Sequence, residues 1–168
     1  ERAPEAAARA PLGVRVVAGT WEQAAVPDRY FDVVSMQDCL EHFPDPVAAL
    51  VKARAALRPG GVLLAVTPNV GSWVAHLQGR RWVSLKFPEH VVLFSPATLR
   101  RALESAGFRL ETVVPAGQYA GVDFVAERVA SGFPRLATWL ARVARALGIG
   151  KQRLYVPSGS IAVVAVSS

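Results

Sequence analysis

Apolar runs alternate with segments of helical period along this chain, and their order predicts an α/β fold. The stretch Tyr30–Pro68 holds one complete unit, with an apolar run at 31–36, a helical pattern that starts at Asp45-Pro46, and a second apolar run at 62–66. Pro59-Gly60-Gly61 predicts the end of that helix. A strand–helix–strand unit closes in one hand, so we predict two buried parallel strands whose carboxyl ends form a common ligand-binding edge.

Further elements are predicted on both sides of this unit. They are a helix over 1–10, a brief strand over 14–18, a helix from Ser95-Pro96 to Gly107, a strand over 108–114 and a final strand over 161–166. The segment 70–92 lacks a clean period and contains Trp73 and Trp82, and a connection of this length is typical of a binding loop or lid.

A helix is also predicted within 117–150, where the composition shifts to Ala, Arg and Val. Its apolar residues recur at helical spacing and are expected to face the body of the protein: Leu136, Trp139, Leu140, Val143 and Leu147. Arg135, Arg142 and Arg145 are then expected to face away. We therefore divide the chain into a core over 1–116, a helical insertion or lid over 117–155, and a final strand of the same sheet over 156–168.

Composition narrows the function classes. The formal charge of +6 and the pI near 10.2 permit anionic partners, but aromatic residues are not interleaved with basic ones along the chain, so no strong nucleic-acid signature is present. No apolar run reaches the length of a membrane span, and no signal peptide is recognised. A single cysteine, Cys39, excludes an internal disulfide and favours a cytoplasmic location.

Candidate chemistry follows the first strand of the central unit. Gln37, Asp38, Glu41 and His42 come directly after it and are expected at the ligand-binding edge. Histidine is the side chain whose pKa suits proton transfer near neutral pH, so His42 and His90 are candidate general bases, with Glu41 placed to orient His42.

A set of motifs resembles the class I S-adenosylmethionine-dependent methyltransferases, in particular the bacterial group that includes ubiquinone-biosynthesis O-methyltransferases. The motifs are Tyr30-Phe31-Asp32-Val33-Val34, Leu40-Glu41-His42, Leu57-Arg58-Pro59-Gly60-Gly61, Thr67-Pro68-Asn69 and Leu93-Phe94-Ser95-Pro96. The resemblance implies a Rossmann-like sheet, mostly parallel with an antiparallel last strand and helices on both faces. It also implies S-adenosyl-L-methionine as the cofactor and a small-molecule acceptor; no oligomeric state is predicted.

The same resemblance assigns cofactor-binding positions. Glu1 matches the acid that grips the ribose hydroxyls in the family, and Gly19, Thr20 and Trp21 match the loop that contacts adenine, although the family usually has aspartate where Thr20 stands. Gln37 and Asp38 match the positions beneath the methionine moiety. Asp38, Glu41, His42 and His90 also resemble a divalent-cation set found in small-RNA 2′-O-methyltransferases, which would take Mg²⁺ or Mn²⁺.

One departure from the family concerns the glycine-rich turn after its first strand, which this chain lacks together with that strand. The chain is therefore interpreted either as a fragment of a longer methyltransferase or as a domain that has lost its cofactor site. The leading hypothesis is O-methylation of a small-molecule hydroxyl, with or without metal assistance. The alternative is a non-catalytic methyltransferase-like module that binds a partner, and an NAD-dependent dehydrogenase ranks last.

Overall fold

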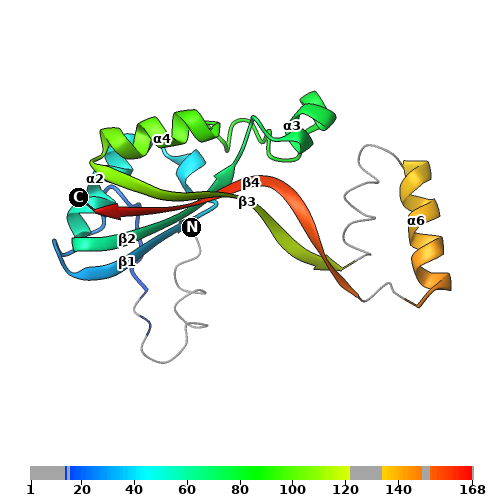
Figure 1. The fold of residues 1–168 in the computed structure, drawn as a ribbon, viewed down its shortest axis with the longest axis horizontal. Coiled ribbons are helices and arrows are strands. Elements are labelled where there is room, and N and C mark those ends of the chain that lie inside the picture. Colours follow the sequence, from blue (N-terminus) through cyan, green and yellow to red (C-terminus); the bar gives the residue numbers. More distant parts are fainter. Residues whose placement is uncertain (1–13, 15, 122–133, 149–151, 168) are drawn as a thin grey trace.

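The computed structural model describes residues 14, 16–121, 134–148 and 152–167 (Figure 1). Within them lies a sheet of four strands in the order β1-β2-β4-β3. The strands are β1 Phe31–Gln37, β2 Leu57–Pro68, β3 Phe108–Gly121 and β4 Arg153–Ser167. β1 and β2 are parallel, and β4 is antiparallel to both β2 and β3, which confirms a mostly parallel sheet with an antiparallel last strand. The helix predicted over 1–10, and Glu1 with it, lies outside the described residues.

Helices form where the sequence supplies caps. The helices are α2 Pro46–Ala56, α3 Trp73–Gln78, α4 Pro96–Ser105 and α6 Pro134–Ala146, with short 3₁₀ turns η1 Leu40–His42 and η2 Gly79–Arg81. Asp45 accepts a hydrogen bond from the Ala48 amide at 2.9 Å, and Ser95 and Thr98 form a reciprocal capping box, so both predicted starts are confirmed. No helix in the described part of the chain is long and apolar enough to span a membrane.

The predicted end of α2 is wrong by three residues. The helix ends at Ala56, Leu57 is already extended, and Pro59-Gly60-Gly61 lies inside β2. The pairing with β1 jumps from Phe31 opposite Leu57 to Val33 opposite Val62, so the intervening residues of β2 form a bulge. Gly60 has φ +76°, which explains glycine at this point of the bulge.

Two of the predicted strands differ from expectation: one is less buried than predicted, and the other does not form in the described residues. β1 forms as predicted but Met36 is its one buried residue, because β1 is the edge strand of the sheet in the described residues. No strand forms in the described part of 14–18, where Val14 and Val17 are more than half exposed. This run has no neighbouring strand among the described residues with which to pair.

The core lies between one face of the sheet and the helices α2 and α4. It combines Leu63 and Ala65 of β2 and Ile161 and Val163 of β4 with Leu50 of α2 and Leu99, Ala102 and Leu103 of α4. The helix predicted from Ser95-Pro96 thus contributes one apolar face to the core. The opposite face of the sheet exposes Val33, Leu64 and Val114 in part, so the described helices α2 and α4 cover only one of the two faces that we expected to be covered.

β3 and β4 continue beyond the sheet and carry α6 at their far end (Figure 1). Trp139 is 59% exposed and Leu147 is 65% exposed, so the prediction that their stripe faces the body of the protein is wrong. The reason is the length of the two strands, which hold α6 away from the sheet. Arg135, Arg142 and Arg145 are exposed as expected. The division of the chain at 116 and 156 stays a prediction, although both strands extend into the middle segment.

The segment 70–92 is more ordered than its sequence pattern indicates. α3 begins at the cap Ser72, and Trp82 is buried against Val74 and Ala75 in a small second core. Trp73, in contrast, is 65% exposed. The loop is therefore folded around its own tryptophan, which fixes the position of the residues that follow it.

Candidate functional site

The carboxyl end of β1 turns sharply into the candidate site. Asp38 has φ +48°, a conformation that asparagine and aspartate tolerate better than other residues with a side chain, and its amide donates to the Val66 carbonyl of β2 at 2.9 Å. This turn directs the chain into η1, whose Leu40 and Glu41 are buried. The polar residues predicted at the edge of the sheet are thus placed there by a local backbone turn.

Glu41 is the most deeply buried charged residue of this edge, with 1% of its surface exposed. Its Oε2 accepts a hydrogen bond from Thr67 Oγ1 at 2.9 Å, and Thr67 itself is fully buried. The backbone carbonyl of Glu41 accepts from the amides of Val91 and Val92 at 3.0 and 3.2 Å. Glu41 therefore contacts both the end of β2 and the loop 84–92 and holds them together. The sequence analysis missed the role of Thr67, because it considered this residue only as a strand end.

His42 and His90 are 48 positions apart in the sequence but lie in contact in the structure. The rings of His42 and His90 lie edge to face, with centroids 4.7 Å apart. His42 Nδ1 lies 2.8 Å from the Glu89 carbonyl, and His90 Nδ1 lies 2.7 Å from the Ser84 carbonyl. A carbonyl oxygen only accepts, so each Nδ1 carries a proton and the neutral ring keeps its lone pair on Nε2.

Glu41, His42 and His90 together form a cluster with one ligand atom each, all within 4.8 Å of one another. Imidazoles whose Nδ1–H is held by a carbonyl are typical metal ligands. Asp38 is not part of this group, so the structure brings together three of the four predicted metal-binding residues. His76 lies apart at α3, where its Nδ1 contacts the Ser72 carbonyl at 2.8 Å.

The loop predicted to contact adenine packs against α2. Gly19 has φ +136°, and the Thr20 carbonyl accepts from the Gln23 and Ala24 amides. Trp21 Nε1 donates to the Ala49 carbonyl at 3.1 Å, and the Lys52 ammonium lies 5.3 Å from the Trp21 ring centroid. The role of this loop in cofactor binding stays a prediction.

Cys39 lies between Asp38 and η1 and is partly buried. Burial, followed by the nearby carboxylates of Glu41 and Asp38, raises the pKa of the Cys39 thiol to about 11. The thiol is therefore protonated near neutral pH, which argues against a nucleophilic role for this cysteine.

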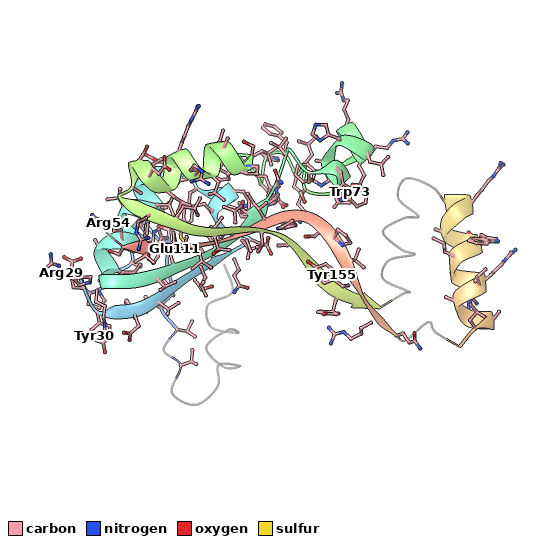
Figure 2. The ribbon with its side chains drawn as sticks, in the orientation of Figure 1. Arg29, Tyr30, Arg54, Trp73, Glu111 and Tyr155 are labelled. Carbon is pink, nitrogen blue, oxygen red and sulfur yellow. The ribbon has the colours of Figure 1, made fainter. Side chains whose placement is uncertain are left out.

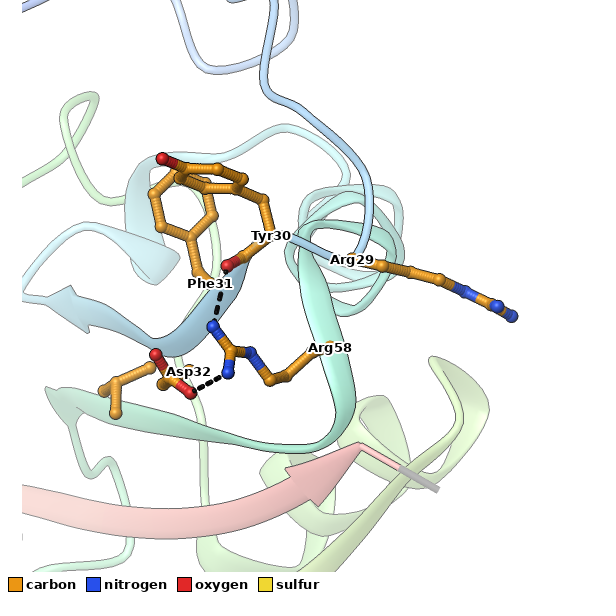
Figure 3. Close-up of a pocket in the computed structure, with 6 residues that line it drawn as sticks. Arg29, Tyr30, Phe31, Asp32 and Arg58 are labelled. Atoms are coloured by element: carbon orange, nitrogen blue, oxygen red, sulfur yellow. Dashed lines mark hydrogen bonds and ion pairs between the residues drawn. The ribbon is translucent and has the colours of Figure 1, made fainter.

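A hollow of about 680 Å³ lies at the other end of β1, lined by Arg29, Tyr30, Phe31, Asp32, Val33 and Arg58 (Figure 3). Arg58 contacts the Asp32 carboxylate at 2.8 Å and the Tyr30 carbonyl at 3.4 Å. Figure 2 shows Arg29 and Tyr30 together at one end of the structure, well away from Trp73. The hollow is open and lies at the amino end of the strand, whereas α/β sheets bind ligands at the carboxyl end, so it is not the candidate site.

Comparison with known proteins agrees with this arrangement. Residues 2–113 match the model of a family described as methyltransferase domain. Ubiquinone biosynthesis O-methyltransferase from Idiomarina loihiensis is 36% identical over 84 residues, which is 45% of this chain and 34% of that protein. The enzyme of the same name from Xanthomonas euvesicatoria is 32% identical over 89 residues, covering 49% of this chain and 37% of that protein. The matched part thus spans about a third of the length of these curated relatives.

Solved structures share the fold. A SAM-dependent methyltransferase from Thermotoga maritima, described as a possible histamine N-methyltransferase, aligns with a TM-score of 0.60 at 20% identity, covering 93% of this chain and 65% of that one. An S-adenosylmethionine-dependent methyltransferase from Mesorhizobium loti gives a TM-score of 0.57 at 18% identity, covering 97% and 74%. The family match covers two thirds of the sequence. The chain belongs to the methyltransferase domain family and has the class I S-adenosylmethionine-dependent methyltransferase fold.

Proposed function

We propose that this chain forms the acceptor side of an S-adenosylmethionine-dependent methyltransferase that methylates a hydroxyl group of a small molecule. The observation that carries the proposal is the cluster of Glu41, His42 and His90 at the carboxyl end of β1, in a chain of the methyltransferase family. Oxygen as the acceptor atom is supported by the curated relatives, which are named O-methyltransferases.

The residues at the edge of the sheet fit the cofactor in part. Bound S-adenosylmethionine supplies an electrophilic methyl group on a sulfonium. Gln37 and Asp38 are exposed at the end of β1, and their oxygen acceptors suit the cationic methionine end. Lys52 occupies one face of Trp21, so that ring has only its other face for stacking. The fit therefore rests on Gln37 and Asp38.

Removal of the acceptor proton is assigned to the histidines. His42 is exposed and His90 is half-buried, and in the neutral rings Nε2 is the nitrogen with a lone pair to accept a proton. Nε2 would take the proton of the hydroxyl, whose oxygen would then be free to accept the methyl group that bound S-adenosylmethionine would supply. The main task of the protein in this displacement is alignment of the two reactants.

A divalent cation fits the same cluster. Two neutral imidazoles and one carboxylate suit Mn²⁺ or Zn²⁺ better than Mg²⁺, which prefers oxygen ligands. Such an ion would compensate the buried charge of Glu41 and lower the pKa of a hydroxyl bound to it. With an ion bound, both Nε2 lone pairs would be ligands, so metal activation of the hydroxyl would replace the histidine base, and the two routes are tested separately.

The experiment uses the natural full-length protein and a panel of catechols with their monomethyl ethers. We expect calorimetry to show binding of S-adenosylhomocysteine, and His42→Gln or His90→Gln to lower kcat by about 10²- to 10⁴-fold for the histidine that acts as base. His76→Gln is the matched control, because that histidine lies outside the cluster. Absence of S-adenosylhomocysteine binding would favour the non-catalytic module instead.

The metal is tested by chelation and by thermal unfolding. Excess EDTA should abolish activity and Mn²⁺ should restore it, while Mn²⁺ should raise the Tm of the wild-type chain but not that of Glu41→Gln. Full activity in EDTA would remove the metal from the proposal and leave the histidine base intact.

A further inference from the structure

β3 and β4 form a two-stranded arm that extends beyond the sheet. β2 pairs with β4 as far as Pro68 opposite Ser160, and in the described residues β4 from Pro157 to Arg153 then pairs with β3 alone. α6 lies at the far end (Figure 1). We call residues 117–121, 134–148 and 152–157 the arm. A two-stranded ribbon buries little on its own, so the arm presents most of its side chains to solvent.

Positive charge is concentrated in this part of the chain. Residues 117–155 contain six basic and two acidic residues, and so carry four of the six net positive charges of the whole sequence. In the described arm there is no acidic residue, and its four arginines, Arg135, Arg142, Arg145 and Arg153, are exposed. Their guanidinium groups form no ion pair with any residue that the structure describes. Among the residues that the structure describes, the arm therefore offers guanidinium groups suited to a polyanion.

Three aromatic side chains are exposed among these arginines. Tyr119 is 67% exposed, Tyr155 is 53% exposed and Trp139 is 59% exposed. Tyr119 and Tyr155 are directly opposite in the ribbon, with ring centroids 5.5 Å apart. Aromatic and basic residues are not interleaved along the sequence. In the folded chain they nevertheless lie together, because the ribbon and α6 bring both kinds of residue to one arm.

On α6 the tryptophan lies where the apolar stripe borders the basic face. Trp139 follows Arg135 by four residues and precedes Arg142 by three, so the three side chains share one face of the helix. Ala137 and Ala144 are buried on the opposite side. An exposed indole beside two guanidinium groups offers a flat ring for stacking with cations near its rim.

We propose that the arm binds single-stranded nucleic acid, with phosphates on the arginines and bases stacked on Trp139 and on the tyrosine pair. A polyanion that also presents flat aromatic surfaces matches both halves of this surface, and sequence-tolerant single-strand binders combine the same two elements. A lipid surface could take the arginines together with the exposed Trp139 and Leu147 of α6, but it would leave the paired tyrosine rings of the ribbon without a stacking partner. A duplex keeps its bases stacked and would leave the aromatic rings unused.

The test measures binding and is independent of the proposed methyl transfer. Fluorescence anisotropy of labelled dT12 and U12 is followed with the full chain at 50 and 200 mM salt. With three or four phosphate contacts, affinity should fall about 20- to 50-fold between these salt concentrations. A duplex of twelve base pairs should bind more weakly than either single strand, and the two single strands show whether the ribose hydroxyl matters.

Variants separate stacking from general attraction. Trp139→Ala should weaken binding about 5- to 150-fold, as expected for one lost base stack, while Trp139→Phe should retain most of the affinity. Arg142→Gln should reduce the salt slope by about 0.7. Trp73→Ala on α3 and Arg101→Gln on α4 are matched controls at exposed positions elsewhere, and they should leave binding unchanged. Circular dichroism confirms that each variant keeps its helix content.

Several results would overturn the proposal. They are no anisotropy change at 50 mM salt, equal loss of affinity in Trp139→Ala and Trp73→Ala, or equal affinity for the duplex. Sedimentation of the chain with phosphatidylglycerol vesicles but no binding of oligonucleotides would likewise replace nucleic acid by a membrane surface.

Discussion

Replacement of Thr67 by valine tests how the buried carboxylate of Glu41 is stabilised. Thr67 Oγ1 donates to Glu41 Oε2 at 2.9 Å, and both residues are at most 1% exposed. Valine has nearly the same shape as threonine, so the cavity cost is small and the loss is that of a hydrogen bond to a charged group, about 1.5–3 kcal/mol. With a denaturant slope of about 2 kcal/mol per molar, the urea midpoint should fall by about 1 M.

The measurement is urea unfolding of the full chain at pH 7, followed by tryptophan fluorescence. Thr112→Val is the control, because this threonine is exposed on β3, and its effect should stay within about 0.5 kcal/mol. In a Glu41→Gln background, Thr67→Val should cost about 1 kcal/mol less than in the wild type, since the carboxylate charge is gone. Equal costs in the two backgrounds, or a Thr67→Val effect no larger than the control, would refute the reasoning.

Four further outcomes are expected. Leu103→Ala removes a fully buried side chain of the core and should cost about 2–5 kcal/mol, whereas Leu77→Ala, at a position 76% exposed, should be nearly neutral in the same urea assay. Gly107 has φ +81°, so Gly107→Ala should destabilise by about 1–2 kcal/mol, and no loss would contradict the left-handed turn. Because the pKa of Cys39 is raised from 9.0 to about 11, iodoacetamide at pH 8 should modify the folded chain roughly 100-fold more slowly than the urea-unfolded chain. The raised pKa also means that stability is complete below pH 9 and falls as the pH rises from about 9 to 11, which the urea midpoint can follow.

Local features of the fold were predictable from the sequence. Asp45-Pro46 and Ser95-Pro96 locate helix starts because a cap acts on amides only two or three residues away. The position of Gln37 and Asp38 at the edge of the sheet followed from the parallel pairing of β1 and β2, which the structure confirms. Each of these inferences depends on a few neighbouring residues and on one rule of chain connection.

Features that depend on distant partners were not predictable in the same way. Helical spacing identifies the stripe that contains Trp139, but the length of β3 and β4 decides whether anything lies opposite it. The apolar run of β1 indicates a strand without indicating how many neighbours it has. Thr67 escaped notice as a partner of Glu41 because the two are 26 positions apart and meet only through the pairing of β1 with β2.

The contacts of Glu41 link the geometry of the cluster to the loop that precedes α4. Its carboxylate is held by Thr67, while its backbone carbonyl holds Val91 and Val92, the two residues after His90. His42 contacts the Glu89 carbonyl of the same loop. A movement of this loop away from the sheet must therefore break three hydrogen bonds and separate His90 from His42. The cluster can therefore be complete only while the loop is in place.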